Sequence, residues 1–219
     1  FTYDMLSIFF NYGTDGDTAG EKTYLWDTIE FVDGDNPPNY SENFEGLDAA
    51  NPDALGTIGG NGYRVFAAVY DNSNTAFQYT YGPFSAPNGG EGFSAIAGGE
   101  GGDEQGDQYL NIYSDYGNRG AQESGQQIRA SVFQEFTLRS GDSGVYRLSF
   151  DAKAPAVDGI GPPTTALAYI QTLDPNAGFI VTRQIELDMT AVRNDAWVRY
   201  SFELEIDASE QTGQLLQFG

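Results

Sequence analysis

The sequence predicts an all-β fold, a jelly-roll β-sandwich of two antiparallel sheets. Short runs of alternating apolar and polar residues recur along the chain, glycine is abundant (28 residues), and no long stretch has helical periodicity. The clearest pair of runs, residues 132–138 and 145–150, flanks the polar connector 140–144 and predicts a strand–turn–strand unit. Alternation places successive side chains on opposite faces, so one face is buried and the other is solvated. Short strands with glycine-rich turns are typical of sandwiches and barrels.

The predicted strands extend over the whole chain. They lie at residues 1–10, 23–32, 64–70, 76–84, 108–116, 127–138, 145–152, 165–173, 179–189, 197–206 and 214–218. Residues 33–42 contain two adjacent prolines, which exclude a central strand and predict a linker. The glycine-rich residues 87–107 predict a long loop or flap. We therefore expect residues 1–32 to form a terminal strand pair that closes this sandwich or a neighbouring one, and residues 43–219 to form the jelly-roll domain.

Composition excludes several classes of function. The 219 residues include no cysteine and no histidine, so disulfides, thiolate metal sites and histidine-dependent catalysis are all excluded. The net charge of −22 repels phosphate backbones and anionic lipid, so we expect neither nucleic acid nor membrane as a partner. Hard cations such as Ca²⁺ suit so many carboxylates. The opening Phe1 and the absence of cysteine favour a mature piece of a secreted, extracellular or cell-surface chain.

From residue 43 onward the chain resembles the calcium-binding carbohydrate-binding jelly rolls appended to xylanases and laminarinases. Four segments carry the resemblance: residues 43–46 (NFEG), 131–154, 196–206 and 213–219. The resemblance implies a non-catalytic extracellular carbohydrate-binding module with structural calcium. In that family a final strand with an aromatic–Asp pair follows the last segment, whereas here the matching residues 24–27 (YLWD) lie at the front. We therefore expect a sandwich that is permuted, or strand-exchanged with another copy, at its N-terminus.

Three acids are predicted to bind the calcium that the resemblance implies: Glu45, Asp151 and Asp27. In the family an acid of the first strand and one near the last share a buried cation. A carboxylate on an otherwise apolar strand face is costly unless it is paired or bound to metal. The alternative is a surface acid, or a carboxylate paired with an arginine or with Lys153. Residues 15–17 and 33–36 resemble small calcium loops, but solvated turns explain their Asp and Gly residues better.

A carbohydrate-binding face is predicted along residues 109–115. Tyr109, Asn111, Tyr113 and Asp115 fall on one face of a strand. Aromatic rings stack on the apolar faces of sugars, and polar groups bond the hydroxyls. Four further residues could extend this face: Tyr79, Tyr81, Trp197 and Arg199. The alternative is that the tyrosines pack beneath the glycine-rich loop or against a neighbouring subunit.

Two other functions stay open. The misplaced end strand favours a structural repeat subunit of an extracellular fibre or adhesin, assembled by β-strand exchange through residues 1–32. Residues 205–210 (EIDASE) nearly match the catalytic signature of family-sixteen glycoside hydrolases, which needs two carboxylates on one strand face. That motif requires a bulky apolar residue where Ala208 stands, and only nine residues follow it. We therefore expect no enzyme activity.

Overall fold

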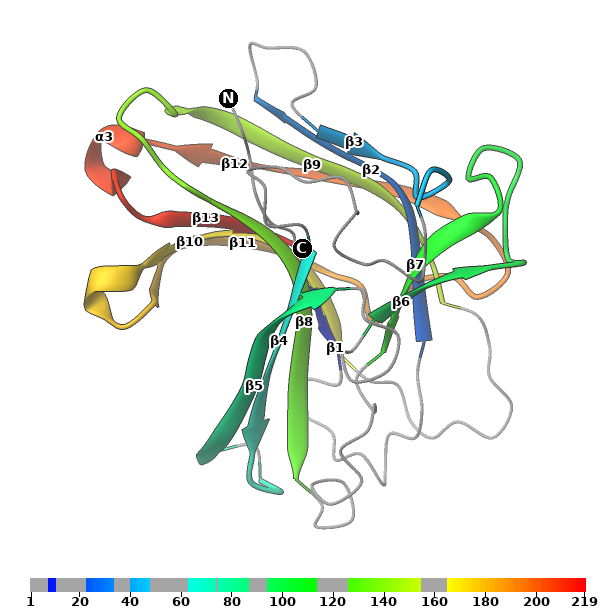
Figure 1. The fold of residues 1–219 in the computed structure, drawn as a ribbon, viewed down its shortest axis with the longest axis horizontal. Helices are drawn as coiled ribbons and strands as arrows, with labels where there is room; N and C mark the ends of the chain where they lie inside the picture. Colours follow the sequence, from blue (N-terminus) through cyan, green and yellow to red (C-terminus); the bar gives the residue numbers. More distant parts are fainter. Residues whose placement is uncertain are drawn as a thin grey trace.

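The structure is a computed structural model that describes residues 8–10, 23–33, 40–47, 63–73, 75–86, 94–113, 126–154 and 165–219. It confirms the predicted all-β sandwich of antiparallel sheets (Figure 1). The strands are β1 (Ile8–Phe10), β2 (Thr23–Asp33), β3 (Tyr40–Glu42), β4 (Tyr63–Tyr70), β5 (Phe77–Ala86), β6 (Ser94–Gly98), β7 (Gln108–Tyr113), β8 (Gln127–Thr137), β9 (Gly144–Lys153), β10 (Ala166–Asp174), β11 (Ile180–Asp188), β12 (Val198–Ile206) and β13 (Leu215–Phe218). Two short helices, η2 (Pro175–Ala177) and α3 (Ala208–Gln211), lie between strands. No helix in these ranges is long and apolar enough to span a membrane.

The strands form two sheets. The seven-stranded sheet has the order β1-β10-β13-β8-β4-β5, with β11 on the other side of β10. The six-stranded sheet has the order β12-β9-β2-β7-β6, with β3 paired to β2. Figure 1 shows the β4–β5 arm and the β10–β11 arm of the first sheet diverging from the long, curved β8. This bend gives the outer face of the seven-stranded sheet a concave shape.

The core lies between the two sheets and follows the alternation of the strands. Along β4, residues 63, 65, 67 and 69 are fully buried, whereas the residues between them are half-buried. In the six-stranded sheet the buried Trp26 stacks on Phe150, with ring centroids 4.2 Å apart and an interplanar angle of 8°. Such a pair contributes stabilisation beyond its buried area. The N-terminal strand β2 is therefore part of the core.

A buried polar network crosses the core between the sheets. The hydroxyls of Tyr40 on β3 and Tyr63 on β4 are 2.7 Å apart, and Gln134 Nε2 of β8 donates to the Tyr40 oxygen at 3.0 Å. Burial raises the pKa of both tyrosines, so they remain neutral. A satisfied network of this kind fixes the relative position of the elements that it joins.

The predicted strand–turn–strand unit at residues 132–153 is only partly correct. Its two strands exist as β8 and β9, but they lie in different sheets and do not pair. Residues 138–143 instead form an arch in which Arg139 N donates to Asp142 Oδ2 at 2.7 Å, and Tyr146 Oη donates to the Asp142 carbonyl at 2.7 Å. The rings of Phe136 and Tyr146 meet across the core at 6.0 Å. Both strands bury their apolar faces, so they stack face to face.

Two strands lie where the sequence predicts none, and one strand alternates irregularly. β3 falls inside the predicted linker 33–42, and β6 falls inside the predicted loop 87–107, where it pairs with β7. The register of β2 against β9 shifts between Asp27 and Glu30. This bulge puts both Trp26 and Ile29 in the core, although simple alternation assigns them to opposite faces.

β1 and β13 share one slot between β8 and β10. Gly219, directly after β13, exchanges both backbone hydrogen bonds with Tyr169 of β10, the Gly219 N donating at 2.7 Å. Ile8 of β1 lies opposite Ala168, the next residue of β10. Phe10 then pairs with β8 as well. β1 therefore continues β13 in register and in the same direction, as though the two were halves of one strand.

Candidate functional site

The first candidate site is the predicted carbohydrate-binding face, which the structure divides between the two sheets. Its members at the six-stranded sheet are Tyr109 and Asn111 on β7, Trp197 directly before β12, and Arg199 on β12. The rings of Tyr109 and Trp197 are 6.0 Å apart at an angle of 59°. These two aromatic residues, from strands far apart in the sequence, do meet.

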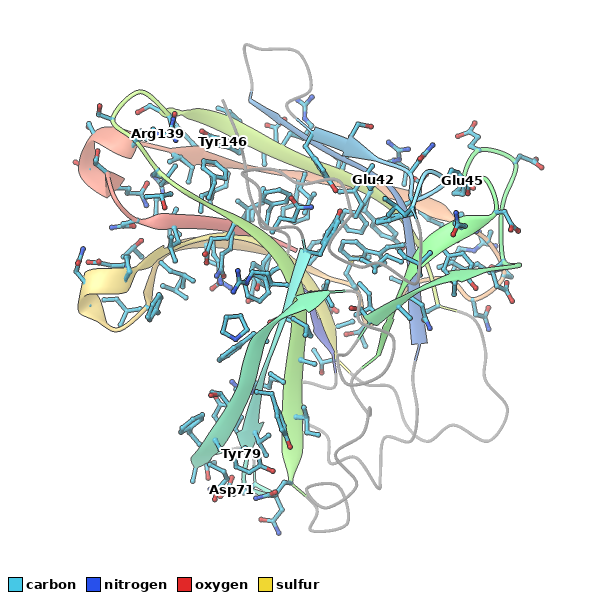
Figure 2. All side chains as sticks on the ribbon, in the orientation of Figure 1. Glu42, Glu45, Asp71, Tyr79, Arg139 and Tyr146 are labelled. Carbon is cyan, nitrogen blue, oxygen red and sulfur yellow. The ribbon has the colours of Figure 1, made fainter. Side chains whose placement is uncertain are left out.

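Tyr79 and Tyr81 belong elsewhere. They lie on β5, at the edge of the seven-stranded sheet, so the expectation that they extend the same face is wrong. In Figure 2 Tyr79 is seen at the end of the β4–β5 arm, away from Glu45 beside the six-stranded sheet. The side chain of Tyr113 and the whole of Asp115 lie outside the described residues.

The segment between β6 and β7, residues 99–107, covers the Tyr109–Trp197 pair. Tyr109 is only 5% exposed; its hydroxyl donates to the Gly98 carbonyl at 3.3 Å, and burial raises its pKa. Trp197 Nε1 donates to the Glu100 carbonyl at 2.8 Å. A Cβ on Gly102 would lie 2.9 Å from the Trp197 ring, so the backbone passes directly against the indole. Tyr109 thus packs beneath the glycine-rich loop, which is the alternative that the sequence leaves open.

Two predicted calcium ligands hold this covering segment. Glu45 Oε1 accepts the backbone N–H groups of Asp107 and Gln108 at 2.6 and 2.5 Å. Asp151 is 2% exposed; it accepts Gln105 Nε2 at 2.8 Å and pairs with Arg199, whose Nε lies 2.5 Å from Oδ1. Both carboxylates therefore bind N–H donors of, or beside, the same segment.

In these contacts the two carboxylates act as acceptors of hydrogen bonds and of an ion pair, not as ligands of a cation such as calcium. The Arg199 guanidinium already supplies the positive charge that a buried Asp151 requires. Asp27 lies opposite Asp151 in the β2–β9 register, but its side chain is outside the described set. Within the described ranges no group of three His, Cys, Asp or Glu residues could hold a metal ion. Structural calcium stays a prediction.

The acidic motif at residues 205–210 is divided by the end of a strand. Glu205 is exposed on β12, whereas Asp207 follows the strand and caps α3. Asp207 Oδ1 accepts the N–H and the hydroxyl of Ser209 at 3.0 and 2.6 Å, and these bonds lower the pKa of Asp207. Asp207 therefore does not share a strand face with Glu205, as retaining hydrolysis would require.

The second candidate site is a cavity of about 720 Å³ on the outer, concave face of the seven-stranded sheet. Its walls come from β4, β8, β10 and β13, and Phe179 at the tip of the β10–β11 hairpin contributes to its rim. The lining residues alternate with core residues along each strand. Arg64 lies opposite Phe133, and Ala68 opposite Arg129, in the β4–β8 register. We refer to this site as the concave cavity.

A ladder of amides crosses one end of the concave cavity. Gln184 Nε2 donates to Gln171 Oε1 at 3.2 Å, Gln171 Nε2 donates to Gln217 Oε1 at 2.7 Å, and Gln217 Nε2 donates to Glu135 Oε2 at 2.7 Å. The four side chains come from the adjacent strands β11, β10, β13 and β8. Their mutual bonds fix each amide in one orientation, so the row presents a preformed polar strip.

Aromatic rings line the rest of the cavity. Tyr169 and Phe133 are nearly buried in its floor, whereas Phe179 at the rim is 60% exposed. Phe179 adopts a left-handed backbone conformation (φ 61°), which is uncommon for a bulky residue and costs conformational energy. Tyr70 is covered by the guanidinium of Arg129, which lies 4.0 Å from the ring centroid. An exposed aromatic residue held in a strained conformation is a candidate ligand-contacting group.

The charges in the cavity are mixed. Arg64, Arg129 and Glu135 are the ionisable side chains, other than tyrosines, among the described lining residues. Burial raises the pKa of Glu135, and this rise is opposed by its bond from Gln217 and by the nearby charge of Arg64. Arg64 Nε is buried without a hydrogen-bond partner in the described structure. Buried donors are usually satisfied, so this group identifies a place where a ligand acceptor fits.

Sequence reasoning missed the concave cavity because its residues are interleaved with core residues. The alternation Arg64, Phe66, Ala68, Tyr70 was available, but so was the same pattern in every other strand. The one distinguishing feature was an arginine on each of two neighbouring strands in a chain that has only ten basic residues.

Comparison of the chain with protein-family models, with curated proteins and with solved structures finds no match.

Proposed function

We propose that this chain is a non-catalytic, extracellular carbohydrate-binding module, and that the concave cavity is its glycan-binding site. The observation that carries the proposal is a cavity of about 720 Å³ that combines aromatic rings with an ordered row of amides. Ligand sites are usually concave, largely apolar and supplied with a few fixed polar groups. Sugars present both an apolar ring face and a fringe of hydroxyls, and this cavity offers a partner for each.

The polarity of the amide ladder supports a polyol ligand. An amide that donates to its neighbour through one N–H still has a second N–H and further acceptor capacity. Gln171 and Gln217 are nearly buried, so a ligand that displaced water from them would have to replace its hydrogen bonds. Sugar hydroxyls are both donors and acceptors, so they can replace those bonds. The exposed ring of Phe179 would lie over the ligand at the rim.

Affinity electrophoresis on a panel of polysaccharides, followed by calorimetry on the glycan that retards the protein, tests this proposal. Phe179→Ala should weaken binding at least about fivefold, because an exposed stacking ring contributes of the order of 1 kcal/mol. Tyr79→Ala is the matched control, since Tyr79 is an exposed ring of the same sheet and is not among the residues that line the cavity. If Tyr79→Ala lost glycan binding and Phe179→Ala kept it, the concave cavity would not be the binding site. If no glycan retarded the protein, the proposed carbohydrate-binding function would be wrong.

A second candidate function, a structural repeat unit of a fibre or adhesin joined by strand exchange, is favoured by one observation. β1 continues β13 in register at Gly219 and Ile8, so the slot between β8 and β10 accepts the segment as a separate strand. An equivalent strand of a second copy has the same backbone groups and could fill that slot. Light scattering across a range of concentrations should then show oligomers. Oligomers that persist in a chain lacking residues 1–10, which keeps the core strand β2, would refute exchange of β1.

A further inference from the structure

The concave cavity concentrates positive charge in an acidic protein. The chain carries 32 acidic and 10 basic residues, yet the described lining holds Arg64 and Arg129 against one acid, Glu135. Four basic residues outside the cavity each pair with a carboxylate: Arg147, Lys153, Arg193 and Arg199. Those pairs explain these four charges as structural, whereas among the residues that the structure describes no such ion pair involves Arg64.

Arg64 has an unmet bonding requirement. Its Nε is buried and has no hydrogen-bond partner among the described residues, although the guanidinium lies in the wall of a cavity large enough for a ligand. The nearby acid does not supply that partner: no hydrogen bond or ion pair joins Glu135 to Arg64 among the described residues, and Glu135 Oε2 accepts from Gln217 Nε2 at 2.7 Å. An anionic group in the cavity would give Arg64 a charged acceptor, and guanidinium–carboxylate bonds are the strongest of this kind.

The two arginines occupy well-separated backbone positions on the outer face of the sheet. In the β4–β8 register Arg64 lies opposite Phe133, and Arg129 is four residues from Phe133 along β8. Four residues of a strand span about 13 Å. The guanidinium of Arg129 is also fixed, because it lies 4.0 Å from the centre of the Tyr70 ring. Two cationic side chains that start from backbone positions this far apart match a chain that bears an acidic group at intervals.

We propose that the glycan recognised in the concave cavity is a polyuronate, a polysaccharide whose uronic acid carboxylates bind Arg64 and Arg129. This inference rests on the proposed function and narrows it to one class of ligand. The amide ladder and Phe179 contact the hydroxyls and ring faces, and the two arginines select for carboxylates. Arginine suits this task because its planar fork matches a carboxylate in a bidentate pair.

The net charge of −22 shapes this selectivity. Exposed carboxylates repel a polyanion at long range, but their effect is screened beyond about 8 Å at physiological ionic strength. Contact with the arginines therefore requires a ligand that enters the cavity and also meets its amides and rings. Dextran sulfate carries its charges on sulfate esters rather than on ring carboxylates, so it is repelled by the surface without gaining the bidentate carboxylate contacts.

Calorimetry of the full chain with polygalacturonate, with carboxyl-reduced polygalacturonate and with dextran sulfate tests the inference. The acidic glycan should bind at least about tenfold more tightly than its carboxyl-reduced form, and dextran sulfate should not bind. Arg64→Gln and Arg129→Gln should each weaken polygalacturonate binding by about tenfold and change binding of the reduced form by less than about twofold. Arg147→Gln is the control, since it removes the same charge from an exposed pair on the other sheet.

The possible failures are distinguishable. If the reduced glycan or a neutral glycan binds as tightly as the acidic one, the polyuronate inference is wrong and the glycan-binding proposal stands. If dextran sulfate binds as tightly, the arginines are a general anion site and the inference is wrong. If no glycan binds, the proposed function itself fails. Should Arg129→Gln unfold through loss of its contact with Tyr70, the comparison of the two glycans on the unaltered chain still decides.

Discussion

Replacing Trp26 with alanine would test whether the N-terminal segment belongs to the core. Trp26 on β2 is 1% exposed and stacks on Phe150 of the neighbouring strand β9 at 4.2 Å. Truncating a buried tryptophan to alanine costs about 3–5 kcal/mol, and a stacked pair adds about 0.5–1.5 kcal/mol. We therefore expect Trp26→Ala to lower the free energy of unfolding by about 5 kcal/mol, a large share of the roughly 5–15 kcal/mol of a typical domain.

Urea unfolding followed by far-ultraviolet circular dichroism measures this loss. The chain has two tryptophans, so the fluorescence of a Trp197→Phe variant reports on Trp26 alone and should be that of a buried indole. Phe179→Ala serves as the control because this side chain is 60% exposed, and its truncation should cost less than about 0.5 kcal/mol. A Trp26→Ala chain within about 1 kcal/mol of the unaltered protein would refute the placement of β2 in the core.

Four further results follow from the contacts of other residues. Arg199→Met should lower the free energy of unfolding by about 3 kcal/mol, because it leaves the Asp151 carboxylate, which is 3% exposed, without its partner. Asp151→Asn should lower it by only about 1 kcal/mol, because the guanidinium that it leaves is 44% exposed. Urea unfolding that gives the larger loss for Asp151→Asn would contradict this explanation. Burial raises the pKa of Glu135, so the stability it contributes is present at low pH and is lost as the pH rises through its folded pKa. The melting temperature of Glu135→Gln relative to the unaltered chain should accordingly rise between pH 4 and pH 7, and a constant difference would count against the assigned burial. A permuted chain that begins within residues 34–39, joins Gly219 directly to Ile8 and ends at residue 33 should give the same circular dichroism spectrum; an unfolded product would contradict the in-register continuation. Melting curves in calcium and in chelator test the predicted metal. Bound calcium should raise the melting temperature, and equal melting temperatures would show that the predicted structural calcium is not bound.

The positions of most strands could be predicted from the sequence because alternation is a local property. The predicted strand at residues 165–173 corresponds to β10, and that at 197–206 corresponds to β12, within one residue at each end. β6 was not predicted because its five residues lie in a glycine-rich segment. It forms a strand through its pairing with β7, which local sequence does not show. Short strands with little pattern of their own depend on contacts that a local reading does not see.

Pairing was harder to predict than position. The connector at residues 140–144 has the composition of a hairpin turn, yet β8 and β9 enter different sheets. The decisive residue is Asp142, whose carboxylate and carbonyl bind Arg139 N and Tyr146 Oη and close an arch. In the structure β8 lies between β13 and β4 in the seven-stranded sheet, whereas β9 lies between β12 and β2 in the six-stranded sheet.

The candidate site shows what local patterns leave out. Alternation identified Tyr109 as a residue of one strand face, but not that residues 99–107 fold over that face and bury it. The concave cavity depends on the curvature of β8 and on the tip of the β10–β11 hairpin, both of which are tertiary features (Figure 1). Arg64 and Arg129 are 65 positions apart in the sequence, and only the β4–β8 register places them on one face.

The register of β1 connects the two candidate functions that the sequence treats as rivals. Tyr169 lines the concave cavity, and both its backbone N–H and its carbonyl are hydrogen-bonded to Gly219, directly after β13. The next position of β10, Ala168, lies opposite Ile8 of β1. The strand that closes the sheet therefore also fixes the cavity floor, because β10 and β8 carry the wall residues and β13 and β1 hold these two strands apart at a constant distance. A segment that completes the fold, whether supplied by the same chain or by a second copy, would thus complete the binding face as well, so strand exchange would preserve glycan binding.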